Sequence, residues 1–337
     1  KVEGRPLVAS RSRPVKKPRA KKKKVVAPAN SRQPASQHNK VSLGEVEALA
    51  SVELLGVAAL SGRKVHASSG STLSTDGESW RISDLYANGL GLDLGQLAFI
   101  WDGESSPYSG VIEVSFGEGF REWENSPLGS SEGDILGVSQ LFIGEESDSS
   151  YWKIGKFASP LLFSNLARYK NASLSHGITT LYGQPHNHVG GLYGVKWVEK
   201  WDLSLWLANG WNQSVSREDS PSMGLILERL LSGDSKVSLG AYGGKSHNSL
   251  VEGSFKLLQI KGAVPLGSYL GLNVGLLMGD FEKTQATAHV GKSVDWQGYF
   301  LHLQYAKGEN WKWNFEVESF SNTKGFMFPS PRWSEIM

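Results

Sequence analysis

Trp311-Lys-Trp-Asn-Phe-Glu-Val-Glu318 is the stretch that decides the fold. Its odd positions are aromatic or aliphatic and its even positions are polar. Successive side chains of a β-strand point to opposite faces, so this alternation predicts a strand with one apolar face and one wet face. The same pattern recurs, in full or in shorter form, at residues 112–116, 152–154, 201–207, 270–276 and 299–305.

The apolar face predicted for these strands has to be buried or covered by lipid. No run of the sequence approaches the ~18 uncharged apolar residues that a membrane-spanning helix needs. The longest apolar blocks lie around Val52–Leu60 and Leu270–Met278 and are about half that length. Only helices and closed barrels satisfy the backbone in lipid, so any membrane-spanning role requires a β-barrel.

Three features favour a membrane barrel over a soluble β-sandwich. Aromatic residues fall near predicted strand ends, as two interfacial girdles require, and the polar face is rich in glycine and ionisable groups. Short connectors also alternate with longer ones, which is typical of periplasmic turns and external loops. The girdle candidates are Trp101, Tyr151, Trp152, Trp197, Trp201, Trp211, Trp296, Tyr305 and Trp311. The longer connectors cover residues 119–134, 160–184, 213–220 and 281–293.

The predicted fold is all-β, an antiparallel transmembrane β-barrel of about 14 strands, because bacterial single-chain barrels have an even number. If the first segment is a helix instead, 12 strands become the better prediction. The predicted strands cover residues 50–61, 90–101, 109–117, 135–145, 151–158, 188–198, 201–211, 222–231, 236–244, 251–261, 268–279, 296–306 and 311–320, with a last strand near 332.

The N-terminal segment is chemically different from the rest of the chain. Residues 1–40 carry 13 Lys and Arg against one acid, a balance of +12, and the remainder carries 22 against 32, a balance of −10. A segment of like charge with no aromatic residue has little to bury, so residues 1–41 are predicted to be a disordered basic tail. Residues 42–79 are predicted to form a first strand or short amphipathic helix plus a loop, and residues 80–337 are predicted to form the barrel. Its closing strand is truncated or incompletely represented if Trp333–Met337 is its start.

Several phrases of the barrel segment resemble the OmpL-like porin-2 family of outer-membrane β-barrels. They are Leu92-Asp-Leu-Gly-Gln-Leu97, Trp152-Lys-Ile-Gly-Lys-Phe-Ala-Ser-Pro-Leu161, His188-Val-Gly190 and Asn209-Gly-Trp-Asn212. The resemblance covers about residues 90–337 and implies a porin-like barrel in the bacterial outer membrane, without enzyme activity. The basic tail is a departure from this family.

The connector 160–184 is a candidate for a pore constriction, because a long external loop can fold inward. It carries Arg168 and Lys170 and no acid, so as a constriction it would favour anions. An ordinary surface loop is the alternative. Alternation also nominates lumen-lining residues that would set ion preference or merely pair across strands: Glu113, Lys153, Lys196, Asp202, His302, Gln304, Asn314, Glu316 and Glu318.

Other site chemistry has weak support. The cluster of His176, His186 and His188 includes a His-x-His pair, but no acid or cysteine accompanies it, so no metal site is predicted. No Gly-x-Ser-x-Gly phrase is present, and the chain has no cysteine, so neither catalysis nor a thiolate site is expected. No cofactor is implied.

The leading functional hypothesis is therefore a porin whose water-filled lumen lets small hydrophilic solutes diffuse passively. Its expected partners are those solutes and the surrounding outer-membrane lipid and lipopolysaccharide. The alternative is a structural barrel that anchors the tail or the external loops to an envelope partner, acidic if it is to bind residues 1–40. A soluble β-protein is the third reading. Nucleic acid is not an expected partner, because the tail has no interleaved aromatic residues for stacking bases.

Overall fold

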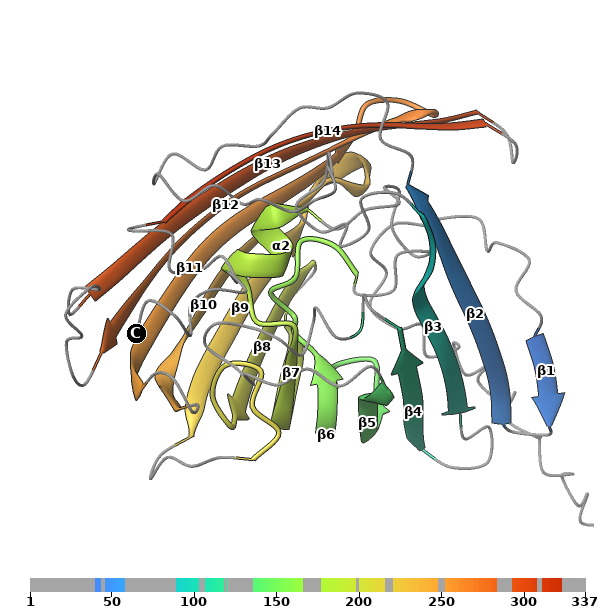
Figure 1. The fold of residues 1–337 in the computed structure, drawn as a ribbon, viewed down its shortest axis with the longest axis horizontal. Coiled ribbons are helices and arrows are strands. Elements are labelled where there is room, and N and C mark those ends of the chain that lie inside the picture. The colour runs from blue at the N-terminus through green and yellow to red at the C-terminus, as the bar shows by residue number, and fades with distance from the viewer. Residues whose placement is uncertain are drawn as a thin grey trace, which may run out of the picture. The chain divides into compact units, whose positions relative to one another are not determined.

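The computed structural model describes residues 40–43, 46–57, 89–102, 107–117, 120, 136–165, 177–197, 200–215, 221–247, 252–283, 293–307 and 311–322. The chain divides into two units, Lys1–Arg32 and Gln33–Met337, and every described element belongs to the second. The predicted basic tail thus lies almost wholly outside the described residues. Fourteen strands form one antiparallel sheet, and each strand pairs with the next in chain order (Figure 1).

The bounds of the elements are as follows. The strands are β1 (Lys40–Leu43), β2 (Val46–Val57), β3 (Gly89–Asp102), β4 (Tyr108–Phe116), β5 (Leu136–Glu146), β6 (Ser150–Ala158), β7 (Asn187–Trp197), β8 (Trp201–Ala208), β9 (Ser222–Leu230), β10 (Lys236–His247), β11 (Glu252–Pro265), β12 (Leu270–Lys283), β13 (Ser293–Lys307) and β14 (Trp311–Asn322). The helix α2 (Ile178–Gly183) lies between β6 and β7, and the 3-10 turn η2 (Ser232–Asp234) joins β9 to β10. Within the described ranges, no helix has the length and apolar character to span a membrane.

The predicted all-β fold is confirmed, and thirteen of the predicted strands overlap observed ones. A strand, β2, occupies the segment for which a helix was the alternative. The short strand β1 was not predicted, since four residues are too few to show alternation. The strand predicted near residue 332 lies outside the described residues.

The predicted end of β8 was wrong. The strand stops at Ala208 rather than continuing to 211, because Gly210 (φ 89°) and Asn212 (φ 51°) adopt left-handed backbone conformations that leave the sheet. Such conformations are typical of glycine and tolerated by asparagine. The chain therefore turns here, and Trp211 is carried away from the strand.

The sheet has two distinct faces, which β8 shows most clearly. Leu205 and Leu207 are 50% and 47% exposed, whereas Trp206 and Ala208 between and beyond them are both 2% exposed. Residues directly opposite one another on antiparallel strands share a face, so the register carries this assignment from strand to strand. We term the face of Trp206, on which α2 also packs, the inward face, and the face of Leu205 the outward face.

Large aromatic side chains on the inward face lie over glycines of the next strand. Trp206 of β8 is opposite Gly224 of β9, and Trp296 of β13 is opposite Gly279 of β12. A Cβ atom added at either glycine would collide with the facing indole ring. The glycines therefore let both indoles lie along the wall of the sheet.

Candidate functional site: the inward face

The outward face is a continuous apolar surface. Its exposed side chains come from every strand from β3 to β14, and they include Phe99, Ile112, Leu141, Ile154, Leu205, Leu225, Leu239, Leu258, Val274, Met278, Leu301 and Phe315. Soluble proteins do not expose apolar surface on this scale, whereas the lipid-facing side of a membrane barrel does. The chemistry that could act on solutes must therefore be sought on the inward face.

The structure places all nine predicted lumen residues on that inward face. Cross-strand partners support this: Lys153 is opposite Leu192, Lys196 is opposite Asp202, and His302 is opposite Glu316. Their role as a channel lining is taken up below as a proposal. Arg168 and Lys170, the predicted constriction residues, lie outside the described residues. The nine residues are Glu113, Lys153, Lys196, Asp202, His302, Gln304, Asn314, Glu316 and Glu318.

The connector between β6 and β7 packs on the inward face on both sides of its undescribed middle. We term its described parts, residues 159–165 and 177–186, the inward segment. Leu161 is fully buried among the side chains of the inward face, and Phe163 lies 4.5 Å from the ring of Phe300 on β13. This contact explains why Phe300 interrupts the polar alternation of β13.

Lys261 of β11 and two glutamines hold the first part of the inward segment. The Lys261 ammonium donates to the carbonyl oxygens of Pro160 (3.3 Å) and Leu162 (3.2 Å). The Gln184 amide donates to the Leu161 carbonyl (2.6 Å) and to Gln259 (2.7 Å) on β11. These bonds satisfy backbone carbonyls that would otherwise be buried without partners.

Helix α2 is held at both ends by the wall of the sheet. Its N-cap residue, Gly177, supplies no side-chain cap, and the Glu318 carboxylate of β14 accepts from the Thr179 backbone N–H (3.0 Å) instead. At the other end, the Trp296 indole N–H donates to the Gly183 carbonyl (3.2 Å). An acid at a helix start and a donor at its end each satisfy groups that a short helix leaves unpaired.

A packed aromatic core covers the inward face toward the longer connectors. Trp211 and Trp296 are 0% and 2% exposed, and their rings meet edge to face at 5.8 Å. Both were predicted as girdle residues, and that prediction was wrong. Trp296 has the inward parity of β13, and the turn at Gly210 and Asn212 carries Trp211 inward. Tyr151, another girdle candidate, also lies inward, opposite Gly194.

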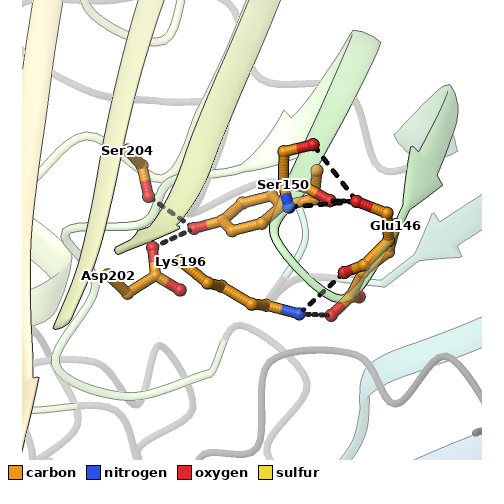
Figure 2. A network of polar contacts seen from close by, with 7 residues as sticks. Glu146, Ser150, Lys196, Asp202 and Ser204 are labelled. Carbon is orange, nitrogen blue, oxygen red and sulfur yellow. Dashed lines mark hydrogen bonds and ion pairs between the residues drawn. The ribbon is translucent and has the colours of Figure 1, made fainter. Parts of the chain in front are cut away.

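A charged network occupies the inward face nearer the short turns (Figure 2). The Tyr151 hydroxyl donates to Asp202 (2.8 Å) and contacts the Ser204 hydroxyl (2.6 Å). Lys196 pairs with Glu146 at 2.5 Å. A second ion pair, Lys236 with Glu228 (2.5 Å), continues the network from β9 to β10. Anionic and cationic side chains therefore lie close together on this part of the wall.

Glu113 lies apart from these ion pairs, in a neutral hydrogen-bonded cluster. Its carboxylate accepts from Gln96 (3.3 Å) and Ser139 (2.7 Å), and Ser115 donates to Ser139 (2.7 Å). The register of β4 and β5 shifts between Glu113, which pairs with Gln140, and Val114, which pairs with Val138. Ser139 is the extra residue at this bulge, and its side chain is buried on the inward face. The side chains that hold this buried carboxylate, Gln96 and Ser139, are uncharged.

The two described histidines of this cluster, His186 and His188, form hydrogen bonds. His186 contacts the Thr180 carbonyl (3.2 Å), and His188 contacts the Ser159 hydroxyl (3.0 Å) among the rings of Phe157, Trp206 and Tyr242. Across the described ranges, no group of three or more histidine or acidic side chains is arranged to hold a metal ion. His176 lies outside those ranges.

Lys261, Gln259 and Gln184 were not identified from the sequence, and Trp211 was identified only as a girdle residue. One signal could have found the first two. The stretch Phe255–Ile260 is apolar at both parities, with Phe255 and Leu257 inward and Leu258 and Ile260 outward. A strand that is apolar on both faces is covered on both faces. The sequence therefore contained a sign that something packs on β11 from within.

The comparisons with known proteins identify the family. The family model described as "Putative beta-barrel porin-2, OmpL-like" matches residues 74–333. The chain belongs to this family. The resemblance read from the sequence is thereby confirmed, and the protein is an outer-membrane β-barrel of the porin type from a Gram-negative bacterium. No curated protein matches the chain.

The chain is similar to several solved structures at low sequence identity. An anion-selective porin from Comamonas acidovorans has 11% identity and a TM-score of 0.48, over 71% of this chain and 74% of that one. The outer membrane channel DcaP of Acinetobacter baumannii has 11% identity and a TM-score of 0.49, over 73% and 72%. A loop-deletion mutant of OmpT, an outer membrane protein of Vibrio cholerae, has 12% identity and a TM-score of 0.42, over 71% and 89%.

Proposed function

We propose that this protein is a non-enzymatic channel that lets small hydrophilic solutes diffuse passively across the outer membrane. The observation that carries the proposal is the division of one sheet into an apolar outward face and an inward face with ionised side chains. Lipid would cover the outward face and water the inward face, as in a membrane barrel. Membership of a porin family supports the same reading.

The channel would be narrow for two reasons. Barrel diameter grows with strand number, and barrels of about 14 strands are narrower than the 16–18-stranded aqueous porins. The inward segment and the aromatic core then occupy part of the enclosed space. Passage would be restricted to small solutes.

Selectivity would come from two regions. The network of Tyr151, Lys196 and Asp202 would form a charged lining on the side of the short turns. Arg168 and Lys170 belong to the same connector as the inward segment, and we propose that they form a constriction that favours anions. Replacing both by glutamine should shift the reversal potential in a salt gradient toward cations.

Planar-bilayer recording of the purified full-length protein tests the channel. Discrete conductance steps are expected, together with liposome swelling in small sugars that declines as the sugar grows. Folding is checked on the same preparation by its heat-modifiable gel mobility. A folded protein without conductance steps would defeat the proposal.

A second function is favoured by one observation, the dense aromatic packing on the inward face. A filled barrel would act as an anchor, with its loops or residues 1–40 bound to an acidic envelope partner. Deleting residues 1–40 separates the two readings. Loss of a co-purifying envelope component or the opening of a pore would support the anchor, and unchanged conductance would support the channel.

A further inference from the structure

Glu113 lies in a group of four polar side chains that come from three neighbouring strands. Gln96 belongs to β3, Glu113 and Ser115 belong to β4, and Ser139 belongs to β5. All four residues are buried on the inward face, at no more than 5% exposure. Ser139 is the extra residue of the bulge in β5, and bulges often re-aim a side chain beside a functional site. We term these four residues the oxygen cluster.

Every side-chain hydrogen that the oxygen cluster can donate is already used within it. The Gln96 amide donates to the Glu113 carboxylate (3.3 Å) and to the Ser115 hydroxyl (3.2 Å). Ser115 donates to Ser139 (2.7 Å). Ser139 in turn donates to the Glu113 carboxylate (2.7 Å), with the Glu113 backbone carbonyl oxygen at 3.2 Å. A primary amide has two donor hydrogens and a hydroxyl has one, so none is left over.

Two oxygen atoms of the oxygen cluster nevertheless lack a donor. The Gln96 amide oxygen is buried and has no hydrogen-bond partner. Both side-chain bonds to the Glu113 carboxylate end on Oε1, so no described residue donates to Oε2. The amide and the carboxylate that carry these two oxygens are in direct contact. Buried acceptors without a donor are destabilising, so the cluster has an excess of oxygen acceptors that its own hydrogens cannot satisfy.

The oxygen cluster also carries a negative charge that no basic side chain offsets. Within the described ranges, no ion pair joins Glu113 to a lysine or an arginine. Apolar side chains lie beside the cluster: Leu94 is the neighbour of Gln96 on the inward face of β3, and the Phe120 ring lies against Gly137 of β5. A charge in such surroundings is costly unless an opposite charge accompanies it.

We propose that the oxygen cluster binds a small monovalent metal cation, of which sodium is the natural example. Such an ion supplies both things that the cluster lacks, a positive charge beside the Glu113 carboxylate and a partner for the Gln96 amide oxygen. Hard cations prefer carboxylate, amide and other oxygen ligands. Calcium sites usually combine several carboxylates, whereas this cluster has one. Its single negative charge therefore matches a monovalent ion.

The bound cation would connect three strands at the place where their pairing is irregular. The bulge interrupts the regular ladder between β4 and β5, and the oxygen cluster joins these two strands to β3 at that level. We therefore expect the ion to stabilise the fold. The inference does not depend on the proposed channel activity, because a filled barrel that acts as an anchor would contain the same four residues.

Thermal unfolding of the full-length protein in detergent, followed by its heat-modifiable gel mobility, tests the proposal. Sodium chloride is compared with choline chloride at equal ionic strength, so that charge screening is the same and only the size of the cation differs. Sodium should raise the unfolding temperature. The ratio of folded to unfolded protein should rise about tenfold for each tenfold increase in sodium concentration above the Kd.

Two variants assign the sodium effect to the oxygen cluster. E113Q keeps the shape of the side chain but removes its charge, and its amide can donate to the Gln96 oxygen, so this variant should unfold alike in sodium and choline. The matched control is E146Q, because Glu146 is an inward carboxylate that already pairs with Lys196. E146Q should keep the full response to sodium. If E113Q does not fold, S139A replaces it, and the response should then weaken by several fold.

Three results would overturn the inference: equal unfolding of the wild type in sodium and choline, a sodium response that persists in folded E113Q, or an equal loss of that response in E146Q. A response to calcium at lower concentrations than to sodium would refute the monovalent assignment. Conductance recorded on the wild type keeps the two proposals separate, because the sodium effect on unfolding can be present or absent whether or not the protein forms conductance steps.

Discussion

Replacing Lys261 by methionine should loosen the inward segment without unfolding the barrel. Lys261 is partly buried on the inward face, and its ammonium donates to the carbonyls of Pro160 and Leu162. Methionine retains most of the apolar stem but cannot donate, so both carbonyls lose a charge-assisted bond. The sheet hydrogen bonds of β11 are backbone bonds and remain.

The size of the effect follows from these two contacts. A hydrogen bond from a charged donor contributes about 1.5–3 kcal/mol, and the distances of 3.3 and 3.2 Å favour the lower value, or about 3 kcal/mol for the pair. Removing this partly buried ammonium relieves part of its desolvation cost, which leaves a net loss of about 1.5–2 kcal/mol. Since 1.4 kcal/mol is a factor of ten, the detached population of residues 159–165 should rise about 10–30-fold.

Hydrogen exchange followed by mass spectrometry measures that population directly. Peptides covering residues 159–165 should exchange about 10–30-fold faster in K261M, while strand peptides of β11 stay protected. Single-channel recordings should show more frequent excursions to a larger conductance. The control is K236M, because Lys236 is an inward lysine of the adjacent strand that pairs with Glu228 and does not contact the segment. Equal exchange of 159–165 in K261M and wild type would refute the reasoning.

Three further substitutions probe the same face. E318Q leaves only a weaker acceptor for the Thr179 backbone N–H, which should destabilise helix α2 by about 0.5–1 kcal/mol. Hydrogen exchange of residues 178–183 should then be a few fold faster, and unchanged exchange would argue against the cap. G224V drives a side chain into Trp206 and should destabilise the barrel by about 1–3 kcal/mol in urea titration, whereas G233V, in a turn with open space around it, tests only the loss of a positive-φ glycine. Y151F removes hydroxyl contacts to a carboxylate and a serine; a stability loss of about 1–2 kcal/mol is expected, and wild-type stability would show that the network is not structural.

The strands could be predicted from sequence because their two environments are encoded in alternate residues. In β14 the order Trp313, Asn314, Phe315, Glu316 directly gives the outward and inward faces. The same rule placed the predicted polar residues of β8, β13 and β14 on the inward face, since these strands have a clear period. Its failure at Trp296 is instructive: an aromatic residue near a strand end was assigned by type, although parity alone decides the face.

The inward segment could not be predicted in the same way. Its residues have no period, and its partners Gln259, Lys261, Trp296 and Glu318 lie far along the chain on three different strands. Contacts of that kind exist only once the sheet has brought the strands together. The length of this connector could suggest an inward-folded loop, as in porins. It could not show which residues of the sheet bind that loop.

The same contacts make the inward segment both an obstruction and a brace. It is bonded to β11, β13 and β14, so it connects β11 to two strands that are not its neighbours in the sheet. Enlarging the pore by displacing the segment therefore breaks bonds that stabilise the wall, and each lost wall contact leaves a buried group without a partner. A general porin of the same strand count could gain conductance by shortening this connector. In this protein Leu161 is fully buried and lies against Gly240 of β10. Because displacing the segment exposes this side chain, we expect conductance to rise and stability to fall together across variants of the segment.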